Sequence, residues 1–524
     1  MWTMPSILLL QRKKPGNSVV KHAGASCFSA PASLREKREH MQNRVKKYLG
    51  MLLVVFLLAG ILLGCGAQTG KNEQQVGTAI QFTDDDGREI ALDAPCKRII
   101  SLYSAHTENL FTLGAGDLIV GVHDTSIYPP ETQKIPVYDY MDDPETIIAA
   151  EPDLVLIRPF ITRKVPGFVK AIETAGIPVV SLYPEKFDDF EDYINKLALL
   201  TGTEEAAAEQ LALFHKNIEA IAQLTKKATE KQRIFFEATE VNLRTITDDS
   251  MAAHAIALAG GKNIAAGAEP VEEGSSIASF GEECILSLAD KIDVYVSQRG
   301  AMNAGGNLHS ILIRPGYDTI KAVQNGRVYV INEKIISSPT FRFYKGVREL
   351  ARYLYPDIMD DLSSYQKDEA ADKGDFANIM VRQLHIPIYV TSSSKYYQTD
   401  TEGHIYGMFE DVTWKDEDFD YIETAAMGGY IPYVEEGDKQ YFKPDAAVTR
   451  EMLAKAVFLL GNFTRQEQSK VIADLNQCDK PNIVQILVDN GIFTLKNGRF
   501  EPQRAVTCNE IIDALTHVSY TVTD

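Results

Sequence analysis

One unbroken helical stretch near the middle of the chain constrains the fold more than any other feature. From Thr203 to about Thr229, apolar residues recur at three- and four-residue steps, and no glycine or proline interrupts them. A helix of that length spans roughly 40 Å at about 1.5 Å per residue. Because this is long enough to connect two lobes, the chain on either side is expected to form two separate packed units.

Each flank of this helix alternates short β-branched runs with amphipathic stretches. The strand-like runs lie at residues 98–101, 118–122, 153–157, 177–182, 233–238, 293–297 and 328–331. Strands that alternate with helices predict parallel sheets covered on both faces. The predicted fold class is therefore α/β, with two Rossmann-like lobes joined by a single long helix and a small, mainly helical C-terminal module.

The first part of the chain contains a segment typical of a secretion signal. Basic residues at 44–47 precede an apolar run at 49–63, and Gly64 and Cys65 follow it. This junction resembles a bacterial lipobox, which implies lipidation of Cys65 and removal of everything before it. The alternative is an uncleaved transmembrane anchor, which the run favours less because it is shorter than about 20 residues. Both interpretations place the rest of the chain outside the cytoplasm.

Composition and charge exclude several classes of function. The chain is 45% hydrophobic and 24% charged, as globular proteins are, and its net charge is −19. Such an acidic chain is not expected to bind nucleic acid or anionic lipid. The chain has no HExxH, GxSxG or Walker A motif, so we do not expect an enzyme.

The cysteines after Cys65 do not have the spacing of a metal cluster. They are Cys96, Cys284, Cys478 and Cys508, with no CxxC pair among them. No metal site is therefore predicted, and four separate thiols are expected. A disulfide between Cys478 and Cys508 is the alternative.

Several segments, taken in order, carry a resemblance to a known family. They are residues 83–90, 97–102, 113–122, 128–130, 151–156 and 259–263. In this combination they resemble the solute-binding proteins for ferric siderophores, cobalamin and haem, which are class III periplasmic binding proteins of ABC importers. The resemblance covers about residues 80–357.

The resemblance implies a lipoprotein on the outer face of the cytoplasmic membrane that delivers a metal chelate to a permease and ATPase complex. A ferric siderophore is the favoured ligand, with cobalamin or haem as alternatives, and no resident cofactor is expected. A different interpretation is a wall-associated adhesive or structural protein that has lost transport.

The ligand of a two-lobed binder is expected at the carboxyl ends of the strands, between the lobes. Tyr103 and His106 follow the first such strand, with Thr107 as the predicted N-cap of the next helix. A direct iron contact by Tyr103 and a haem-ligand role for His106 are the alternatives to simple hydrogen bonding. Arginines also occupy strand-exit loops, and they favour an anionic ligand because guanidinium groups pair with carboxylates or catecholates. They are Arg158, Arg163, Arg244, Arg299 and Arg342.

One glutamate per lobe is a candidate for docking onto the permease. Glu145 and Glu283 each begin a predicted helix, and the family resemblance implies that surface glutamates at these positions contact permease arginines, with Glu282 as the alternative to Glu283. A carboxylate at a helix start also stabilises the helix dipole without any partner.

The last part of the chain contains an internal repeat. Residues 409–412, 419–427, 442–445 and 448–455 are echoed by 482–490, 491–493, 500–502 and 506–507. The repeat resembles degenerate S-layer-homology modules, which implies that Arg450 contacts a cell-wall polymer.

These patterns divide the chain as follows. We expect an upstream extension at 1–40, a signal peptide at 41–64, a flexible tether at 65–79, a solute-binding domain at 80–357, a connector at 358–408 and the repeats at 409–520. Within the solute-binding domain the expected parts are an N-lobe at 80–200, a bridging helix at 201–229 and a C-lobe at 230–357.

Overall fold

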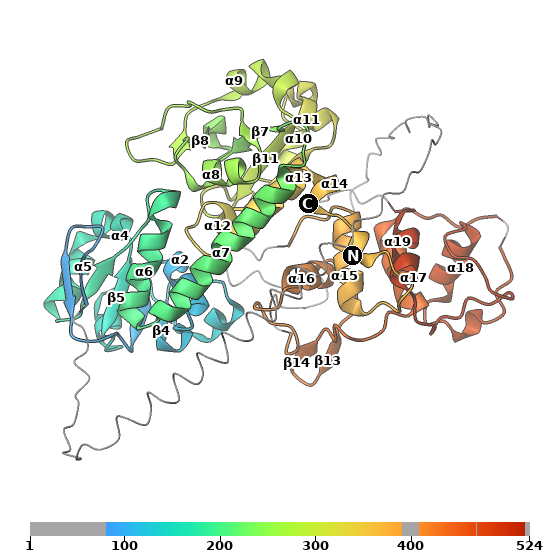
Figure 1. Cartoon of the computed structure of the whole chain (residues 1–524), viewed down its shortest axis with the longest axis horizontal. Coiled ribbons are helices and arrows are strands. Elements are labelled where there is room, and N and C mark those ends of the chain that lie inside the picture. Colours follow the sequence, from blue (N-terminus) through green and yellow to red (C-terminus); the bar gives the residue numbers. More distant parts are fainter. Residues whose placement is uncertain (1–79, 390–406, 408, 468, 519–524) are drawn as a thin grey trace, which may run out of the picture. The chain divides into compact units, whose positions relative to one another are not determined.

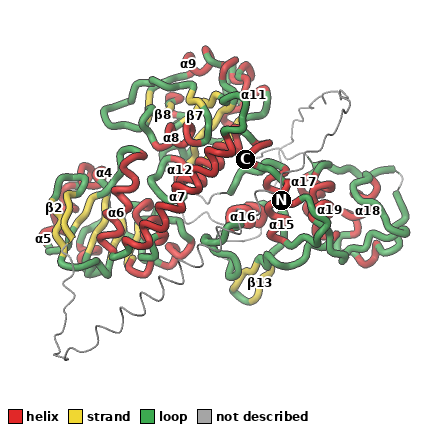
Figure 2. Tube along the Cα trace, in the orientation of Figure 1, coloured by secondary structure: helices red, strands yellow, loops and turns green. Residues whose placement is uncertain are grey.

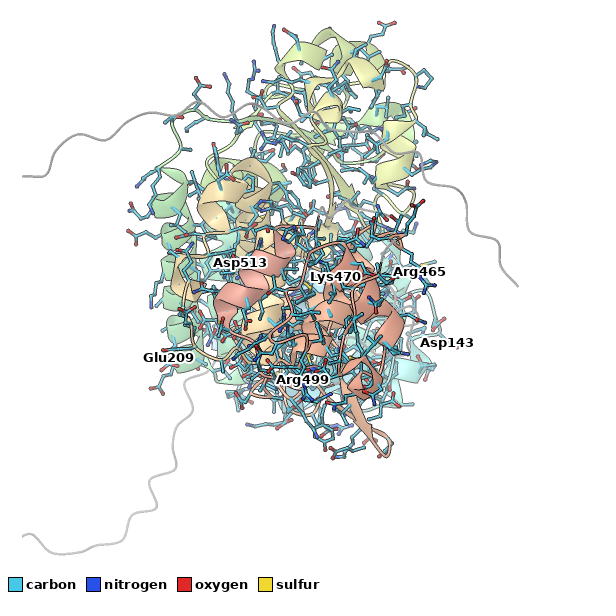
Figure 3. The ribbon with its side chains drawn as sticks, turned by 90° about the vertical axis from the view of Figure 1, so that its right-hand side faces the viewer. Asp143, Glu209, Arg465, Lys470, Arg499 and Asp513 are labelled. Carbon is cyan, nitrogen blue, oxygen red and sulfur yellow. The ribbon has the colours of Figure 1, made fainter. Side chains whose placement is uncertain are left out.

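The computed structural model describes residues 80–389, 407, 409–467 and 469–518 (Figure 1). The predicted signal peptide, the tether and Cys65 lie outside these residues. No helix within the described part of the chain is long and apolar enough to cross a membrane. Several charged side chains point outward from the ribbon, as Figure 3 shows for Asp143, Glu209, Arg465, Lys470, Arg499 and Asp513.

The N-lobe is built on a four-stranded parallel sheet in the order β4-β3-β5-β6. Its strands are β3 (Ile99–Ser101), β4 (Ile119–Val122), β5 (Leu154–Ile157) and β6 (Val179–Ser181). β5 is buried along its whole length because elements cover both faces of the sheet. The helices of this lobe are α2 (Ser104–Thr112), α3 (Glu145–Ile148), α4 (Pro159–Lys164), α5 (Pro166–Thr174) and α6 (Phe190–Thr201), and an antiparallel hairpin, β1 (Ile80–Thr83) and β2 (Glu89–Leu92), precedes them.

The C-lobe repeats this plan with a parallel sheet in the order β12-β11-β7-β9. Its strands are β7 (Arg233–Glu237), β9 (Lys262–Asn263), β11 (Val294–Arg299) and β12 (Val328–Asn332), and β8 (Thr245–Ile246) pairs with β10 (Ile277–Ala278) outside the sheet. Its helices are α8 (Met251–Leu258), α9 (Glu282–Ser287), α10 (Leu308–Leu312), α11 (Lys321–Gln324), α12 (Glu333–Ile336), α13 (Phe343–Leu354) and α14 (Pro356–Met359). Figure 2 shows helices around the strands of both sheets. The predicted α/β fold class with two parallel-sheet lobes is confirmed.

The long helix α7 (Glu204–Thr225) joins the two lobes (Figure 1). It packs against α6 of the N-lobe and against α8, α13 and α14 of the C-lobe. Leu211, Phe214, Ile218 and Ile221 are buried at the predicted three- and four-residue spacing, and two glutamates in the first turn favour the helix dipole. Its 22 residues correspond to about 33 Å, which is shorter than the roughly 40 Å expected because the helix ends at Thr225.

A seam of direct contacts also joins the lobes beside α7. Asn109 of α2 donates its side-chain amide to the carbonyl of Pro339 at 2.9 Å and accepts the backbone N–H of Phe341 at 3.1 Å. Phe341 lies against Phe190 and Phe214, with ring centroids 5.5 and 6.1 Å apart. We call this contact between α2 and residues 337–345 the interlobe seam.

The C-terminal module begins earlier than the sequence indicated. Helix α15 (Lys373–Gln383) packs against α16 (Phe419–Met427) and α19 (Cys508–Leu515), and its residues Phe376, Ile379 and Met380 are fully buried in the module core. The prediction of a connector over the whole of 358–408 was therefore wrong, because α15 supplies part of this core. The module also contains α17 (Arg450–Leu460), α18 (Pro481–Asp489) and the hairpin β13 (Val434–Glu436) and β14 (Lys439–Tyr441).

Three equivalent helix starts converge within the module. Asp372, Thr449 and Thr507 cap α15, α17 and α19, each accepting the backbone N–H three residues on. The segments before these helices pair with one another through three isolated antiparallel bridges: Ala370 with Thr507, Asp372 with Ala447, and Thr449 with Ala505. The start of α15 therefore shares the capping and bridging pattern of α17 and α19, which the sequence analysis did not predict.

The four described cysteines are unpaired. Cys478 and Cys508 are both buried, and burial raises the pKa of each thiol to about 11. The alternative of a disulfide between them is therefore wrong. The described residues also contain no group of three or more His, Cys, Asp or Glu side chains arranged to hold a metal ion.

Candidate ligand-binding site

The carboxyl ends of the N-lobe strands form an aromatic edge. Tyr103, two residues after β3, lies near Tyr183, two residues after β6, with ring centroids 6.1 Å apart. Arg158, directly after β5, holds its guanidinium carbon 4.8 Å from the centre of the Tyr103 ring and 4.9 Å from that of Phe160. These residues meet because the ends of parallel strands lie at one edge of a sheet. Cation–π contact with two rings keeps the Arg158 side chain at this edge.

A second aromatic pair extends this edge. His123, directly after β4, stacks on Tyr140 with ring centroids 5.3 Å apart and planes 10° apart. Tyr140 in turn meets Phe160 edge to face. Phe160 is 38% exposed, so the edge presents an apolar surface beside a cation. Sequence reasoning missed His123, Tyr140 and Tyr183, although His123 and Tyr183 follow predicted strands and could have been found on that ground.

Tyr103 is placed as predicted but is chemically a neutral phenol. Burial, together with the neighbouring Tyr183, raises its pKa well above the ordinary value, although Arg158 opposes this shift. The hydroxyl therefore remains protonated at neutral pH. Coordination of iron by the Tyr103 oxygen would therefore require the hydroxyl to lose its proton when the metal chelate binds.

His106 does not line the edge, where the sequence analysis predicted it. Helix α2 begins at Ser104 with Tyr103 as its N-cap, not at Thr107, so His106 lies inside the first turn and is fully buried. Its Nδ1 lies 2.7 Å from the Tyr193 hydroxyl and its Nε2 lies 2.9 Å from the carbonyl oxygen of Ile157. Burial lowers the pKa of the imidazole to about 4. Both ring nitrogens are thus engaged inside the lobe, and neither faces the edge.

The carboxyl ends of the C-lobe strands carry a buried polar network. Glu237, at the end of β7, is fully buried and accepts hydrogen bonds from the Tyr295 hydroxyl at 2.5 Å and the Ser297 hydroxyl at 2.9 Å. Arg314 pairs with the same carboxylate and lies 3.7 Å from Glu240. Arg314 balances the charge of the buried Glu237 carboxylate, so neither group is free for a ligand, and we call this network the floor of the C-lobe edge.

A glycine-rich loop at residues 300–306 lies on this floor. The side-chain amide of Asn303 donates to the carbonyl of Gln298 at 2.8 Å, and its oxygen accepts the backbone N–H of Glu240 at 2.9 Å. Glu333 accepts the backbone N–H of Met302 at 2.9 Å. A Cβ at Gly300 would overlap the Glu333 side chain, so the close approach requires glycine. Glu240, which follows β7, and Glu333, which follows β12, thereby fix the shape of the loop.

Two predicted arginines of the C-lobe have different surroundings. Arg299 is the last residue of β11, is exposed, and forms no ion pair with any described residue. Arg244 is half-buried, and its backbone bridges to Thr239 beside the floor. Arg299 is therefore available to a ligand at the strand ends.

Arg342, which was predicted to bind the ligand, is engaged by protein partners between the lobes. Its guanidinium donates two hydrogen bonds of 2.7 Å to the two carboxylate oxygens of Glu108 in α2, and it lies 3.6 Å from the centre of the Tyr128 ring. The side chain is 8% exposed, and that of Glu108 is 4% exposed. A bidentate pair of this kind occupies the guanidinium fork, so Arg342 closes the interlobe seam.

Lys334, which sequence reasoning missed, brings a second cation to the strand ends. It lies in the first turn of α12, two residues after β12, and its ammonium donates to the Ser104 hydroxyl of the N-lobe at 2.8 Å. Burial lowers the pKa of Lys334. The carboxylates of Glu333 and Glu108 oppose this shift, whereas the charges of Arg158 and Arg342 add to it. The two lobes thus touch where Lys334 meets Ser104, with Arg158 close enough to repel the ammonium.

The candidate docking glutamates are both on the surface. Glu145 and Glu283 are exposed in the first turns of α3 and α9. Arg450, in contrast, is 6% exposed and donates to the carbonyl of Thr494 at 2.6 Å. Its guanidinium also faces the rings of Phe493 and Phe500, so these contacts join the start of α17 to residues 493–500.

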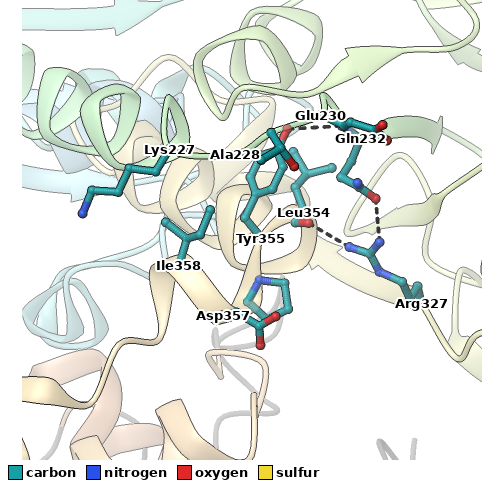
Figure 4. Close-up of a pocket in the computed structure, with 11 residues that line it drawn as sticks. Lys227, Ala228, Glu230, Gln232, Arg327, Leu354, Tyr355, Asp357 and Ile358 are labelled. Atoms are coloured by element: carbon teal, nitrogen blue, oxygen red, sulfur yellow. Dashed lines mark hydrogen bonds between the residues drawn. The ribbon is translucent and has the colours of Figure 1, made fainter. Parts of the chain in front are cut away.

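One hollow lies away from the strand ends. A space of about 520 Å³ is lined by residues near the end of α7 and the end of α13 (Figure 4). Its Arg327 donates to Gln232 at 2.7 Å and to the carbonyl of Leu354 at 2.9 Å. Gln232 and Arg327 precede β7 and β12, so this hollow is at the amino ends of the strands and its polar groups already bond to one another.

Comparison with known proteins shows what this chain is similar to. Residues 99–335 match the profile of the family described as periplasmic binding protein. An uncharacterised ABC transporter substrate-binding lipoprotein of Bacillus subtilis, YvrC, is 26% identical over 327 residues, which are 60% of this chain and all of that protein. A vitamin B12-binding protein of Vibrio cholerae is 24% identical over 269 residues, 51% of this chain and 91% of that one.

A solved structure of a possible iron-binding, periplasmic solute-binding protein from Staphylococcus epidermidis shares 25% identity with this chain. It covers 50% of this chain and 99% of its own, with a TM-score of 0.43. Residues 99–335 are thus similar to the periplasmic binding protein family, and ABC-transporter substrate-binding proteins are among the proteins that the chain resembles.

Proposed function

We propose that the chain is the extracytoplasmic substrate-binding component of an ABC importer and that it captures an anionic metal chelate, with a ferric siderophore favoured. The family match and the relatives named above support the transport role, since periplasmic binding proteins bind solutes and are not enzymes. The single observation that carries the ligand class is the position of Arg158 among aromatic rings at the N-lobe strand ends.

The chemistry of this edge matches a chelate with carboxylate or catecholate arms. Such arms accept hydrogen bonds from a guanidinium, and flat catecholate rings stack on tyrosine and phenylalanine. Lys334 and Arg299 would contact the same ligand from the C-lobe. Because Lys334 already donates to Ser104, a ligand must either replace that hydrogen bond or lie beside it.

Haem and cobalamin are the alternative ligands. His106, the histidine that favoured haem, is buried with both nitrogens bonded, which removes one argument for haem. Cobalamin keeps support from the relatives named for vitamin B12 binding. The aromatic edge would accept either ring system, so the choice depends on the ligand's charge.

The test is a titration of the full chain with ferric catecholate, hydroxamate and carboxylate siderophores, haemin and cyanocobalamin, followed by calorimetry. We expect binding of a ferric siderophore, and we expect Arg158→Ala to weaken it by about tenfold to a hundredfold, as for loss of a charged hydrogen bond. Arg163→Ala is the matched control, because Arg163 lies at the exposed end of α4. Absence of binding to every compound, or equal binding by both variants, would refute the proposal.

The proposal includes attachment to the outer face of the cytoplasmic membrane through a lipid on Cys65. Glu145 and Glu283 would then dock the two lobes onto the permease. Contact with a wall polymer through the C-terminal repeats remains a prediction from the resemblance.

A further inference from the structure

The C-terminal module is bonded to the C-lobe through a buried carboxylate. Asp420, in the first turn of α16, accepts hydrogen bonds from Lys345 at 3.0 Å and from Arg348 at 2.9 Å, both on α13. Asp420 is 6% exposed. Burial alone would raise its pKa, but the two cations hold the pKa below its ordinary value, so the carboxylate is charged at neutral pH.

Further along α13, a second charged group binds the backbone of the module. Arg352 pairs with Asp360 at 2.7 Å and with Glu349 at 2.9 Å, and it also donates to the carbonyl of Ile386 at 3.2 Å. Glu349 accepts the backbone N–H of Ile388 at 3.0 Å. The chain leaving α15 is therefore fixed to the last long helix of the C-lobe.

The module also contacts the N-lobe. The indole N–H of Trp414 donates to Glu131 at 3.0 Å, and the Trp414 ring lies 5.9 Å from the ring of Tyr128. Tyr128 is 4% exposed and packs within the apolar core of the module, although it belongs to the N-lobe loop after β4. This loop is the second point at which the module holds the solute-binding domain.

The two attachments meet at the interlobe seam. Tyr128 contacts Trp414 of the module and Arg342 of the C-lobe, and Arg342 pairs with Glu108 of the N-lobe. A rotation of one lobe against the other would have to move Tyr128 relative to Arg342 or pull Asp420 away from α13. Each movement would leave buried charges without their partners, which is unfavourable.

We propose that the C-terminal module is a brace that fixes the angle between the two lobes. It holds the N-lobe at Tyr128 and Glu131 and the C-lobe at Lys345 and Arg348, and so keeps the two strand-end edges at a set separation. This role concerns the stiffness of the domain, and it does not depend on which solute is bound.

The test measures the distance between the lobes by pulsed electron paramagnetic resonance on the full chain. One spin label is attached to the exposed Cys284 of α9 and the other to a cysteine at the exposed Asp192 of α6, with Cys27 and Cys65 replaced by serine. The buried thiols react slowly because burial raises the pKa of Cys96 to about 12 and those of Cys478 and Cys508 to about 11.

The Trp414→Ala and Asp420→Ala double variant removes the hydrogen bond to Glu131 and the carboxylate that Lys345 and Arg348 hold, and so weakens the module's hold on both lobes. We expect its interlobe distance distribution to be about twice as broad as that of the parent chain, because a released lobe samples more orientations. Glu436→Ala is the matched control, since Glu436 is an exposed hairpin residue that pairs only with Lys443 among the ion pairs described. The control should leave the distribution unchanged.

Trp414→Ala alone decides the question if the double variant does not fold. Trp414 lies at the edge of the module, half-buried, and its loss leaves Asp420 paired. A broader distribution in this single variant supports the brace. A distribution equal to that of the parent chain overturns it, and neither result bears on solute transport.

Discussion

The strand-end edge of the N-lobe and the interlobe seam contain arginines that the sequence assigned to one binding cleft. At the edge, Arg158 lies over Tyr103 and Phe160 and forms no ion pair with a described carboxylate. At the seam, Arg342 is locked to Glu108 by two hydrogen bonds. The difference shows that an arginine predicted at a strand exit can have or lack a buried acidic partner, and that the position after a strand does not tell the two cases apart.

The largest expected effect comes from breaking the seam. Glu108→Ala leaves Arg342 buried without its partner, and removal of one member of a buried ion pair costs about 3–5 kcal/mol. Urea unfolding at neutral pH should show this loss. Glu145→Ala removes an exposed carboxylate and should change the free energy of unfolding by less than about 0.5 kcal/mol. A loss below about 1 kcal/mol for Glu108→Ala would show that the seam does not depend on this pair.

A nearly equal effect is expected from His106 as pH changes. Its pKa is lowered to about 4 in the folded state, from an ordinary 6.5, so the unfolded chain binds a proton more readily between these values. The folded state is therefore favoured above pH 6.5 and loses about 3 kcal/mol of that advantage as pH falls to 4. Unfolding of the parent chain and of His106→Gln should be compared across this range.

The control for this pH series is His215→Gln. His215 is 57% exposed, and its removal should leave the pH dependence of unfolding unchanged. Parallel stability curves for the parent chain and His106→Gln would contradict the assignment of a neutral, buried imidazole.

Substitution of Lys334 tests whether this cation binds the ligand, as proposed for Arg158, or stabilises the contact between the lobes, as Arg342 does. If it serves a ligand as Arg158 does, Lys334→Met should weaken binding of a ferric chelate by about tenfold or more. If it belongs to the seam as Arg342 does, the affinity should not change and the stability should fall. Ser104→Ala removes only its protein partner at 2.8 Å, and calorimetry on both variants separates these outcomes.

The smallest effect on stability is expected at the exposed helix starts. Glu145→Gln with Glu283→Gln should alter the free energy of unfolding by less than about 0.5 kcal/mol and leave solute affinity unchanged. Uptake by cells should nevertheless fall if these carboxylates dock onto the permease. Uptake equal to that of the parent chain would assign them to the helix dipole alone.

The regular elements could be predicted because their signals are local. The segment 419–427 of the predicted mainly helical module matches α16 to the residue, and the main strands agree within two residues at each end. α15 could also have been found, since Phe376, Ile379 and Met380 follow helical spacing. The polar residues before α15 favoured a connector at 358–408, so this helical spacing was not recognised.

The seam could not be predicted from sequence. Glu108 and Arg342 are 234 residues apart in the chain, and no local pattern pairs them. The start of α2 was misplaced for a related reason, because the Thr107 hydroxyl donates to the Ser101 hydroxyl at 2.8 Å instead of capping a helix. Tertiary partners of this kind override the usual preference of threonine for a helix start.

The ring of three bridges in the C-terminal module has a consequence for how the protein is made. Ala370, near its beginning, pairs with Thr507, near its end, so the ring closes only after almost the whole chain has been synthesised. Until then, α15 has no α19 to cover its apolar face. A chain truncated by a late stop codon would therefore contain both lobes together with an incomplete C-terminal module. The uncovered apolar face of α15 in that module is where we expect quality-control proteases to act first.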